Sequence, residues 1–131
     1  MWIFQRDMST PPEAAASFDI EEETLRNDDY RRVLWTGPRM QVVLMSLLPG
    51  ETIDEEVHED GDQFFRVEKG TAFVTVGAQR RRMTARDGWS VVVPAGTSHE
   101  VRACEHGAKL YTIYAPPQHR PGTVEKTKPV H

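Results

Sequence analysis

A series of short β-type runs between residues 31 and 115, each bounded by glycine, proline or aspartate, constrains the fold of this chain more than any other feature. Several runs alternate apolar and polar residues, which is the pattern of a strand with one buried face. No long stretch of this region keeps the 3.6-residue apolar period of a helix, so the crossover helices of a parallel α/β sheet are not expected. The pattern predicts an all-β fold, either a sandwich or a barrel.

The two ends of the chain differ from this region in composition and lack its β-type runs. Residues 1–30 contain Pro11-Pro12 and an Ala/Ser-rich stretch, and they predict an N-terminal arm. Within it, Asp19 to Asn27 has a possible N-cap followed by acidic residues, which indicates a short helix. Residues 116–131 form a Pro-rich C-terminal tail. The 131 residues are therefore expected to form one domain, with the barrel at 31–115 between two short extensions.

Composition limits the location and the partners of the protein. Cys104 is the single cysteine, so the chain can form neither an internal disulfide nor a Cys-rich zinc site. The apolar residues Trp2-Ile3-Phe4 are interrupted at once by polar ones, so neither a secretion signal nor a membrane span is expected. The net charge is −4, and the basic cluster Arg80-Arg81-Arg82 is best explained as a solvated turn or strand edge. We expect a cytoplasmic protein that binds neither nucleic acid nor membranes.

The first candidate site lies between residues 50 and 70. Side chains of an extended segment alternate between two faces, so Glu56 and His58 project the same way and could grip one metal ion. A short turn through residues 59–62 then reverses the chain and can place Gln63 beside them. Gln63 shares its strand face with apolar residues, which indicates that this face is interior.

The second candidate site lies between residues 88 and 103. His99, Val101 and Ala103 alternate with charged residues, so His99 is expected on an apolar, interior face. A buried imidazole needs a partner, because leaving it unpaired costs free energy. From spacing alone that partner is either a metal ion or a neighbouring hydrogen-bonding side chain.

Together these stretches resemble the two signature motifs of the cupin superfamily. The first is usually written G-x5-H-x-H-x3-4-E-x6-G, and this chain has Glu56, His58 and Gln63 at the three ligand positions, ending at Gly70. The second is usually G-x5-P-x-G-x2-H-x3-N, and this chain reads Gly88-x5-Pro94-x-Gly96-x2-His99-x3-Ala103. The resemblance covers about residues 31 to 115. It implies a double-stranded β-helix, which is a small jelly-roll barrel with metal ligands converging inside.

Three residues depart from the usual motifs. Glu56 stands where the family has its first histidine, Gln63 stands where it has glutamate, and Ala103 replaces the final asparagine. The first two changes are complementary, since the set of Glu56, His58, Gln63 and His99 still offers two imidazoles, one carboxylate and an amide oxygen. Such a mixture suits a divalent ion such as Zn, Mn, Fe or Ni. An empty barrel with a hydrogen bond from Glu56 to a histidine is the alternative.

Two classes of function fit this site. The first is a metal-dependent enzyme, an isomerase, dioxygenase or lyase, that acts on a small polar substrate such as a sugar or organic acid, with Glu56 as a possible general base. The second is a non-enzymatic module that binds or senses a small ligand or metal. Small cupins that resemble this chain are often labelled mannose-6-phosphate isomerase-like, which gives a further alternative. A highly charged phosphosugar would, however, require inward basic residues.

Other residues that could reach the barrel interior are less distinctive. We expect Phe65, Val101 and Tyr111 to border the substrate pocket, although Tyr111 and Tyr114 lie on opposite faces of one strand and at most one can reach it. Core packing is the more common role for either tyrosine. His119 belongs to a tail that could fold over the barrel mouth, but a histidine in a tail is usually solvated.

The sequence also bears on the oligomeric state. The run Val42-Val43-Leu44-Met45 is apolar on both faces of a predicted strand, and Phe64 is expected to point outward. In a one-domain barrel the simplest second cover is another subunit, so we expect a homodimer, as is common in the family. Trp2-Ile3-Phe4 of the arm could reach across the same interface.

Overall fold

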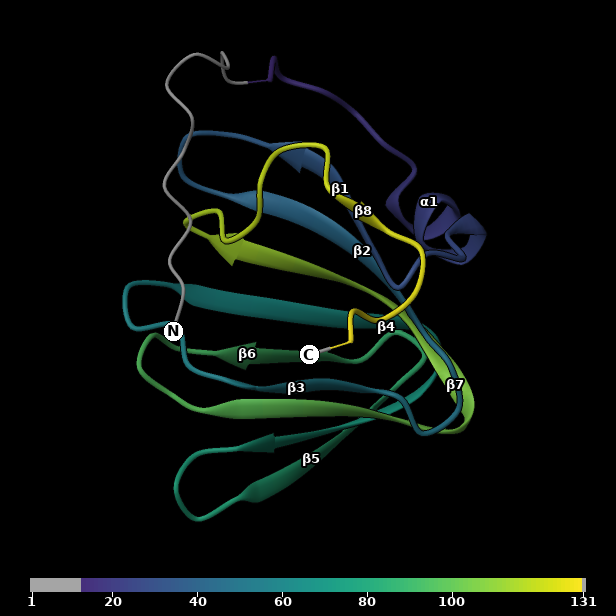
Figure 1. Cartoon of the computed structure of the whole chain (residues 1–131), viewed down its shortest axis with the longest axis vertical. Coiled ribbons are helices and arrows are strands. Elements are labelled where there is room, and N and C mark those ends of the chain that lie inside the picture. The colour runs from purple at the N-terminus through teal and green to yellow at the C-terminus, as the bar shows by residue number, and fades with distance from the viewer. Residues whose placement is uncertain (1–12, 131) are drawn as a thin grey trace.

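A computed structural model describes residues 13–130 of the chain, and Figure 1 shows its course. Residues 1–12, with Trp2-Ile3-Phe4, and His131 lie outside the described residues. In chain order the elements are α1 (Ile20–Arg26), β1 (Arg31–Thr36), β2 (Gln41–Leu47), β3 (Thr52–Glu56), β4 (Asp62–Val76), β5 (Arg81–Arg86), β6 (Ser90–Val93), β7 (His99–Ala115) and β8 (Val124–Glu125).

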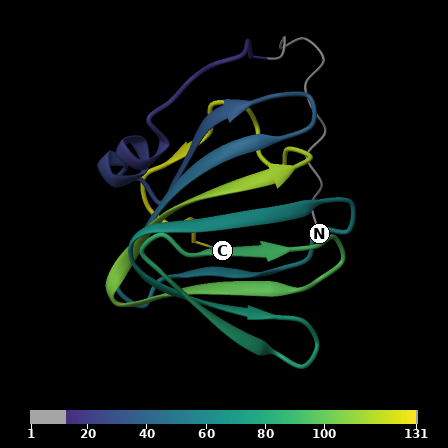
Figure 2. The same ribbon diagram turned by 180° about the vertical axis from the view of Figure 1, so that it is seen from behind.

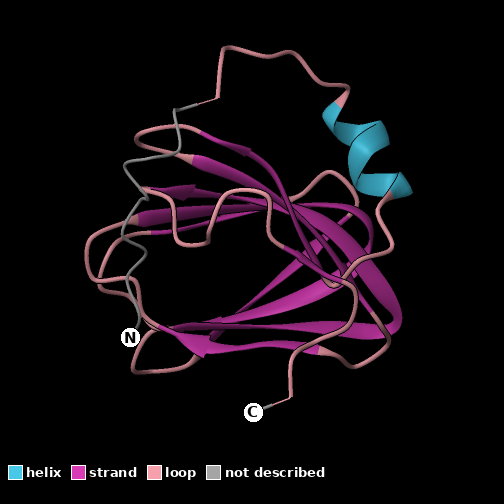
Figure 3. Cartoon of the chain, turned by 45° about the horizontal axis from the view of Figure 1, so that its top comes forward, coloured by secondary structure: helices cyan, strands magenta, loops and turns pink. Residues whose placement is uncertain are grey.

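The strands pair antiparallel in the order β5-β4-β7-β2-β1-β8, and β3 and β6 pair with β7 and β4 respectively. Figures 1 and 3 show them as two layers that face each other. The long strands β4 and β7 belong to both layers. In one layer, residues 62–67 of β4 pair with residues 110–115 of β7. In the second layer, residues 72–76 of β4 pair with residues 99–103 of β7. The predicted all-β barrel of double-stranded β-helix type is thus confirmed.

The passage of β4 and β7 between the layers corrects one detail of the sequence prediction. The sequence analysis took the glycines between residues 31 and 115 as bounds of short runs, but Gly70 and Gly107 both lie within continuous strands. The register shifts on either side of Gly70, between Val67 and Lys69 and between Gly70 and Ala72. Such irregularities bend a strand, and they allow one strand to serve both layers.

Contact between the two strands at this bend explains why glycine is needed there. Gly70 has a φ of +84°, a left-handed conformation that glycine adopts without the steric cost of a side chain. A Cβ atom on Gly70 would also lie 2.2 Å from the backbone oxygen of Gly107. The two strands therefore approach each other more closely here than any side chain allows.

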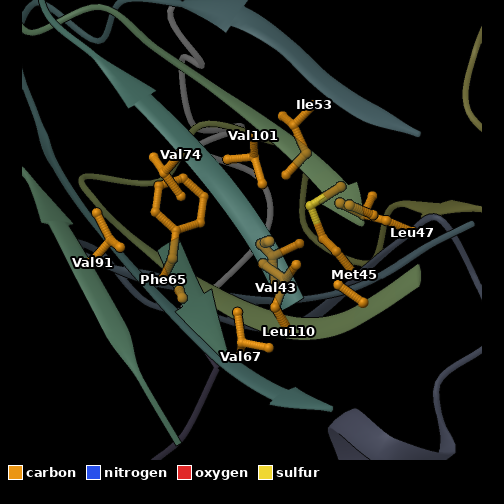
Figure 4. Close-up of a cluster of buried hydrophobic side chains, with 14 of the residues drawn as sticks. Val43, Met45, Leu47, Ile53, Phe65, Val67, Val74, Val91, Val101 and Leu110 are labelled. Carbon is orange, nitrogen blue, oxygen red and sulfur yellow. The ribbon is translucent and has the colours of Figure 1, made fainter. Parts of the chain in front are cut away.

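Alternate residues of the strands fill the space between the layers. Figure 4 shows this apolar cluster, to which β2, β4 and β7 contribute the side chains of Val43, Met45, Phe65, Val101 and Leu110, all at most 2% exposed. Burial of this apolar surface is the main force that holds the layers together. The cluster fills one part of the barrel interior. The buried polar side chains described in the next subsection lie beside it.

Helix α1 has the predicted position, with Asp19 as its N-cap, and it packs against the outer face of β2, β4 and β7. Lys109 of β7 donates from Nζ to the backbone oxygens of Leu25 and Asn27, each at 2.9 Å, so a cation caps the carbonyl end of the helix. Leu44 is only 1% exposed and lies beside this helix. The helix thus supplies part of the cover that the sequence analysis assigned to a second subunit, and the homodimer stays a prediction.

The C-terminal tail folds back onto the barrel. Strand β8 pairs with β1, and Arg31 forms an ion pair with Glu125 at this point. Further along, Lys128 donates to Asp54 at 2.6 Å. Figures 1 and 2 show β8 and α1 at the same end of the barrel. No helix in residues 13–130 is long and apolar enough to cross a membrane.

Candidate metal centre

Three of the four predicted metal ligands meet at one end of the barrel. Glu56 is the last residue of β3 and lies directly opposite His99, the first residue of β7, in the antiparallel register. His58 follows Glu56 by two residues, and its backbone oxygen accepts a hydrogen bond from the Gly96 N–H at 2.9 Å. One ligand atom from each of Glu56, His58 and His99 lies within 4.8 Å of the other two. The residues of the two sequence stretches therefore form a single site.

The polar atoms of this site are buried and close together, but the contacts between them do not have hydrogen-bond geometry. The Oε1 atom of Glu56 lies 3.2 Å from the Nε2 atom of His58 and 3.8 Å from that of His99. Among the described residues, these three atoms are buried without a hydrogen-bond partner, and so is the Nδ1 atom of His58. Buried polar groups rarely stay unpaired, so their convergence requires an explanation. A cation held between them would satisfy them.

The orientation of His99 fits the same explanation. Its Nδ1 atom lies 3.1 Å from the backbone oxygen of Thr97, so the ring carries its proton on Nδ1 and donates to that oxygen. The Nε2 lone pair is then left facing Glu56. Metal-binding histidines are commonly fixed in this way, with one ring nitrogen donating to a carbonyl and the other available to the metal.

The fourth predicted ligand, Gln63, begins the inward face of β4 and is 2% exposed. Its Nε2 atom donates to Thr112 Oγ1 at 2.9 Å. This bond uses one end of the amide and leaves the Oε1 atom, which is buried without a hydrogen-bond partner among the described residues. Gln63 therefore offers a neutral oxygen of the kind that divalent ions accept.

The electrostatic environment favours the ligating form of the site. Burial lowers the pKa of His99, and this effect outweighs the opposing influence of the Thr97 carbonyl and of Glu56, so the ring is neutral. For Glu56, burial by itself would raise the pKa, but the neighbouring His58, His99 and Arg31 together bring it below its usual value. Neutral imidazole and ionised carboxylate are the forms that bind a metal.

A cavity of about 560 Å³ opens beside these residues. It is lined by Glu55, Glu56, Val57, His58, Glu59, Gln118 and His119. Two of the lining residues belong to the C-terminal tail, so the tail forms one wall of the cavity. The cavity has the size of a site for a small molecule.

The predicted pocket residues Phe65, Val101 and Tyr111 do not line this cavity. Phe65 and Val101 point inward as expected, but they pack within the apolar cluster and do not line the cavity. Tyr111 lies on the opposite face of β7, where its ring packs against Phe64 at 6.1 Å between centroids. Tyr114 occupies the inner face instead, is 1% exposed, and stands edge-on to His58 at 5.5 Å.

Sequence reasoning also missed the part that His119 plays. Its ring stands edge-on to Tyr114 with 5.2 Å between centroids, and its Nε2 atom lies 3.4 Å from the Tyr114 hydroxyl. Burial lowers the pKa of His119 to about 4, with a contribution from the nearby cation of Arg31. The prediction of a solvated tail histidine is therefore wrong. No local pattern could have revealed this, because the contact depends on how the tail folds back.

The fold and the site define a class of protein: a small antiparallel barrel with a His/Glu group at one end. The cupin domain family matches residues 43–114, and the chain belongs to this family. The crystal structure of BH2720 from Bacillus halodurans is similar, with 42% identity, a TM-score of 0.80, and coverage of 93% of this chain and 94% of that one.

Two curated relatives are similar over most of this chain. The uncharacterized protein L612 of Acanthamoeba polyphaga mimivirus is 44% identical over 114 residues, which are 85% of this chain and 71% of that protein. The uncharacterized protein YrkC of Bacillus subtilis (strain 168) is 44% identical over 115 residues, or 84% of this chain. The chain spans 62% of the length of YrkC. These relatives support the family and leave the activity open.

Proposed function

We propose that the protein holds one divalent metal ion through Glu56, His58, Gln63 and His99 and acts as a metal-dependent enzyme on a small polar molecule in the adjoining cavity. The observation that carries this proposal is the convergence of Oε1 of Glu56 and Nε2 of both histidines, which are buried without hydrogen-bond partners among the described residues. Oε1 of Gln63 is also buried without a partner among these residues. In a metal-free structural role these atoms would be expected to form well-aligned hydrogen bonds, and the shortest contact, from Glu56 Oε1 to His58 Nε2 at 3.2 Å, does not have that geometry.

The donor set indicates which ions fit. Two imidazole nitrogens, one carboxylate oxygen and one amide oxygen form a set of intermediate hardness, which suits Zn, Mn, Fe(II) or Ni. Four protein ligands leave a further position for a substrate atom in an ion that accepts five or six ligands. A bound ion would supply Lewis acidity, which polarises a carbonyl or hydroxyl group of the substrate.

The side chains around the cavity can bind and orient a substrate. Glu56 is ionised and its side chain is 31% exposed at the cavity, so it can accept a proton from a molecule bound there. Behind the cavity wall, burial raises the pKa of Tyr114, so its hydroxyl keeps its proton at neutral pH and lies 3.4 Å from Nε2 of His119. Gln118 and His119 add further polar groups to the wall. These polar groups favour an enzyme over a purely apolar binding module.

The lining of the cavity also bears on the class of substrate. Among residues 13–130, those that line it include three carboxylates, from Glu55, Glu56 and Glu59, and no lysine or arginine. Phosphate groups are usually held by arginine or lysine side chains. We therefore propose an unphosphorylated substrate, which separates this protein from isomerases of phosphosugars. A ligand-sensing role is the alternative, and turnover of a bound ligand by the metal-loaded protein would distinguish the two.

Metal content tests the proposed site directly. We expect the protein, purified without a His tag, to bind about one divalent ion per chain, and we expect His58→Ala and His99→Ala each to lower the affinity at least a hundredfold by removing a ligand. His106→Ala is the matched control, because that side chain is 83% exposed and far from the site in the fold. The measurement is metal analysis by mass spectrometry after dialysis. Equal stoichiometry in all four proteins would refute the four-ligand site.

Gln63 can be tested separately, because its two polar atoms have different partners. Gln63→Leu removes the proposed ligand oxygen and should lower metal affinity about tenfold, whereas Thr112→Val removes only the hydrogen bond that orients the amide. We expect the second variant to have a smaller effect. Competition with a chromophoric chelator would measure both affinities. An unchanged affinity in Gln63→Leu would remove Gln63 from the ligand set.

A further inference from the structure

The side chain of Gln41 holds the backbone of the C-terminal tail beside the metal pocket. Gln41 is fully buried and begins β2, where it lies directly opposite Tyr114 of β7. Its Nε2 atom donates to the backbone oxygen of His119 at 2.7 Å. Its Oε1 atom accepts from the backbone N–H groups of His119, at 3.1 Å, and of Gln118, at 3.3 Å. One amide side chain therefore binds both backbone groups of His119.

This arrangement fixes the amide of Gln41 itself. The Nε2 atom of Gln41 also donates to Thr36 Oγ1 at 3.0 Å, so both ends of the amide are used. A buried amide with all its bonds directed in this way has one favourable orientation. The tail at residues 118–119 is thereby tied to β1 and β2 of the barrel at a defined position.

The consequence is the position of the His119 ring. Its ring packs edge-on against Tyr114, whose own ring packs edge-on against His58. His119 also lines the same cavity as Glu56 and His58. His119 is therefore part of the wall of the cavity in which a ligand of the proposed metal ion would lie.

The hydrogen-bonding state of His119 follows from its surroundings. The ring is neutral at neutral pH, because burial and the cation of Arg31 disfavour its protonation. The Tyr114 hydroxyl keeps its proton and lies 3.4 Å from His119 Nε2, so it can donate to that atom. The imidazole proton then resides on Nδ1, where it can be donated to an acceptor atom of a ligand.

We propose that His119 is a substrate-contacting residue of the metal pocket, which donates a hydrogen bond to an oxygen or nitrogen acceptor of the ligand, and that Gln41 is the positioning residue that holds it there. The C-terminal tail is therefore part of the functional site. This inference rests on the proposed metal-dependent function, because it concerns the cavity beside the same ion.

Cobalt(II) and azide provide the test. Cobalt(II) replaces the native ion and its visible spectrum reports the ligand set, while azide is a small acceptor that adds to an accessible ion and changes that spectrum. We expect His119→Ala to bind cobalt(II) with unchanged affinity and azide about tenfold more weakly, because one hydrogen bond to the anion is lost. His119→Asn keeps an N–H donor and should recover part of the azide affinity. His106→Ala should bind azide as the wild-type protein does.

Gln41→Leu tests the positioning role. We expect the same loss of azide affinity with the His119 ring intact, together with faster hydrogen exchange at the amides of Gln118 and His119 measured by NMR, because their acceptor is gone. His119→Ala should leave the exchange of the Gln118 amide slow. This contrast separates loss of the side chain from release of the tail.

The outcomes distinguish the two proposals. A wild-type protein that binds no cobalt(II) would overturn the proposed function and this inference with it. Cobalt(II) binding with equal azide affinity in wild type and His119→Ala would overturn this inference alone, and so would a cobalt-loaded wild type that binds no azide. If Gln41→Leu fails to fold, the comparison of His119→Ala with His119→Asn still decides whether the ring donates to the ligand.

Discussion

Gly70→Ala is expected to destabilise the protein by about 3–5 kcal/mol, a large part of the stability of a domain of this size. The added Cβ atom would lie 2.2 Å from the backbone oxygen of Gly107, and neither strand can move without breaking the pairing of β4 with β7 on both sides. The left-handed backbone of Gly70, with φ +84°, adds about 1–2 kcal/mol. Urea unfolding followed by tryptophan fluorescence would measure the loss.

Gly77→Ala is the matched control for this prediction. Gly77 has a similar φ of +77°, but a Cβ atom there would meet nothing within 4 Å. We expect this variant to lose only the conformational part, about 1–2 kcal/mol. The difference between the two variants isolates the close approach of the strands at the bend. Equal losses would show that β4 and β7 can separate there at little cost.

The barrel could be predicted from sequence because its signal is local. An alternation of apolar and polar residues indicates each strand, and glycine, proline or aspartate indicates each turn. The same local reasoning failed at Gly70 and Gly107, because glycine marks both turns and bends within strands. Which of the two applies depends on a partner strand that is distant in the sequence.

The candidate metal site could likewise be predicted to the extent that its residues lie in two short motifs. Glu56 and His58 are two residues apart, and His99 follows a Pro-Ala-Gly turn, so their inward direction follows from strand geometry. The choice between Tyr111 and Tyr114 needed the register of β7, which no single strand reveals. His119 needed the path of the tail, which is set by the long-range contact with Gln41.

Acidification is expected to lower the free energy of unfolding, because His119 is protonated more easily in the unfolded chain than in the folded one. The folded protein holds the pKa of His119 at about 4, below the usual 6.5. Between these pH values the unfolded chain binds a proton that the folded chain does not. The contribution of His119 to the unfolding free energy is therefore fully present above pH 6.5 and is lost as the pH falls towards 4. A difference of about 2.5 pKa units corresponds to about 3 kcal/mol by pH 4.

His119→Gln isolates this contribution, because glutamine does not titrate. Arg31, Glu56, His58 and Tyr114 also lie near the ring, so the loss in the wild type alone would not identify His119. Urea unfolding of the metal-free proteins at pH 7 and pH 4 should show that wild type loses about 3 kcal/mol more than the variant. An equal loss of unfolding free energy in wild type and variant would mean that the tail detaches and exposes His119 to solvent before the imidazole is protonated. Gln41 holds the tail that carries this ring, so Gln41→Leu should also reduce the pH dependence of the unfolding free energy. Stability in acid would then depend on the same contact that holds His119 in the cavity wall.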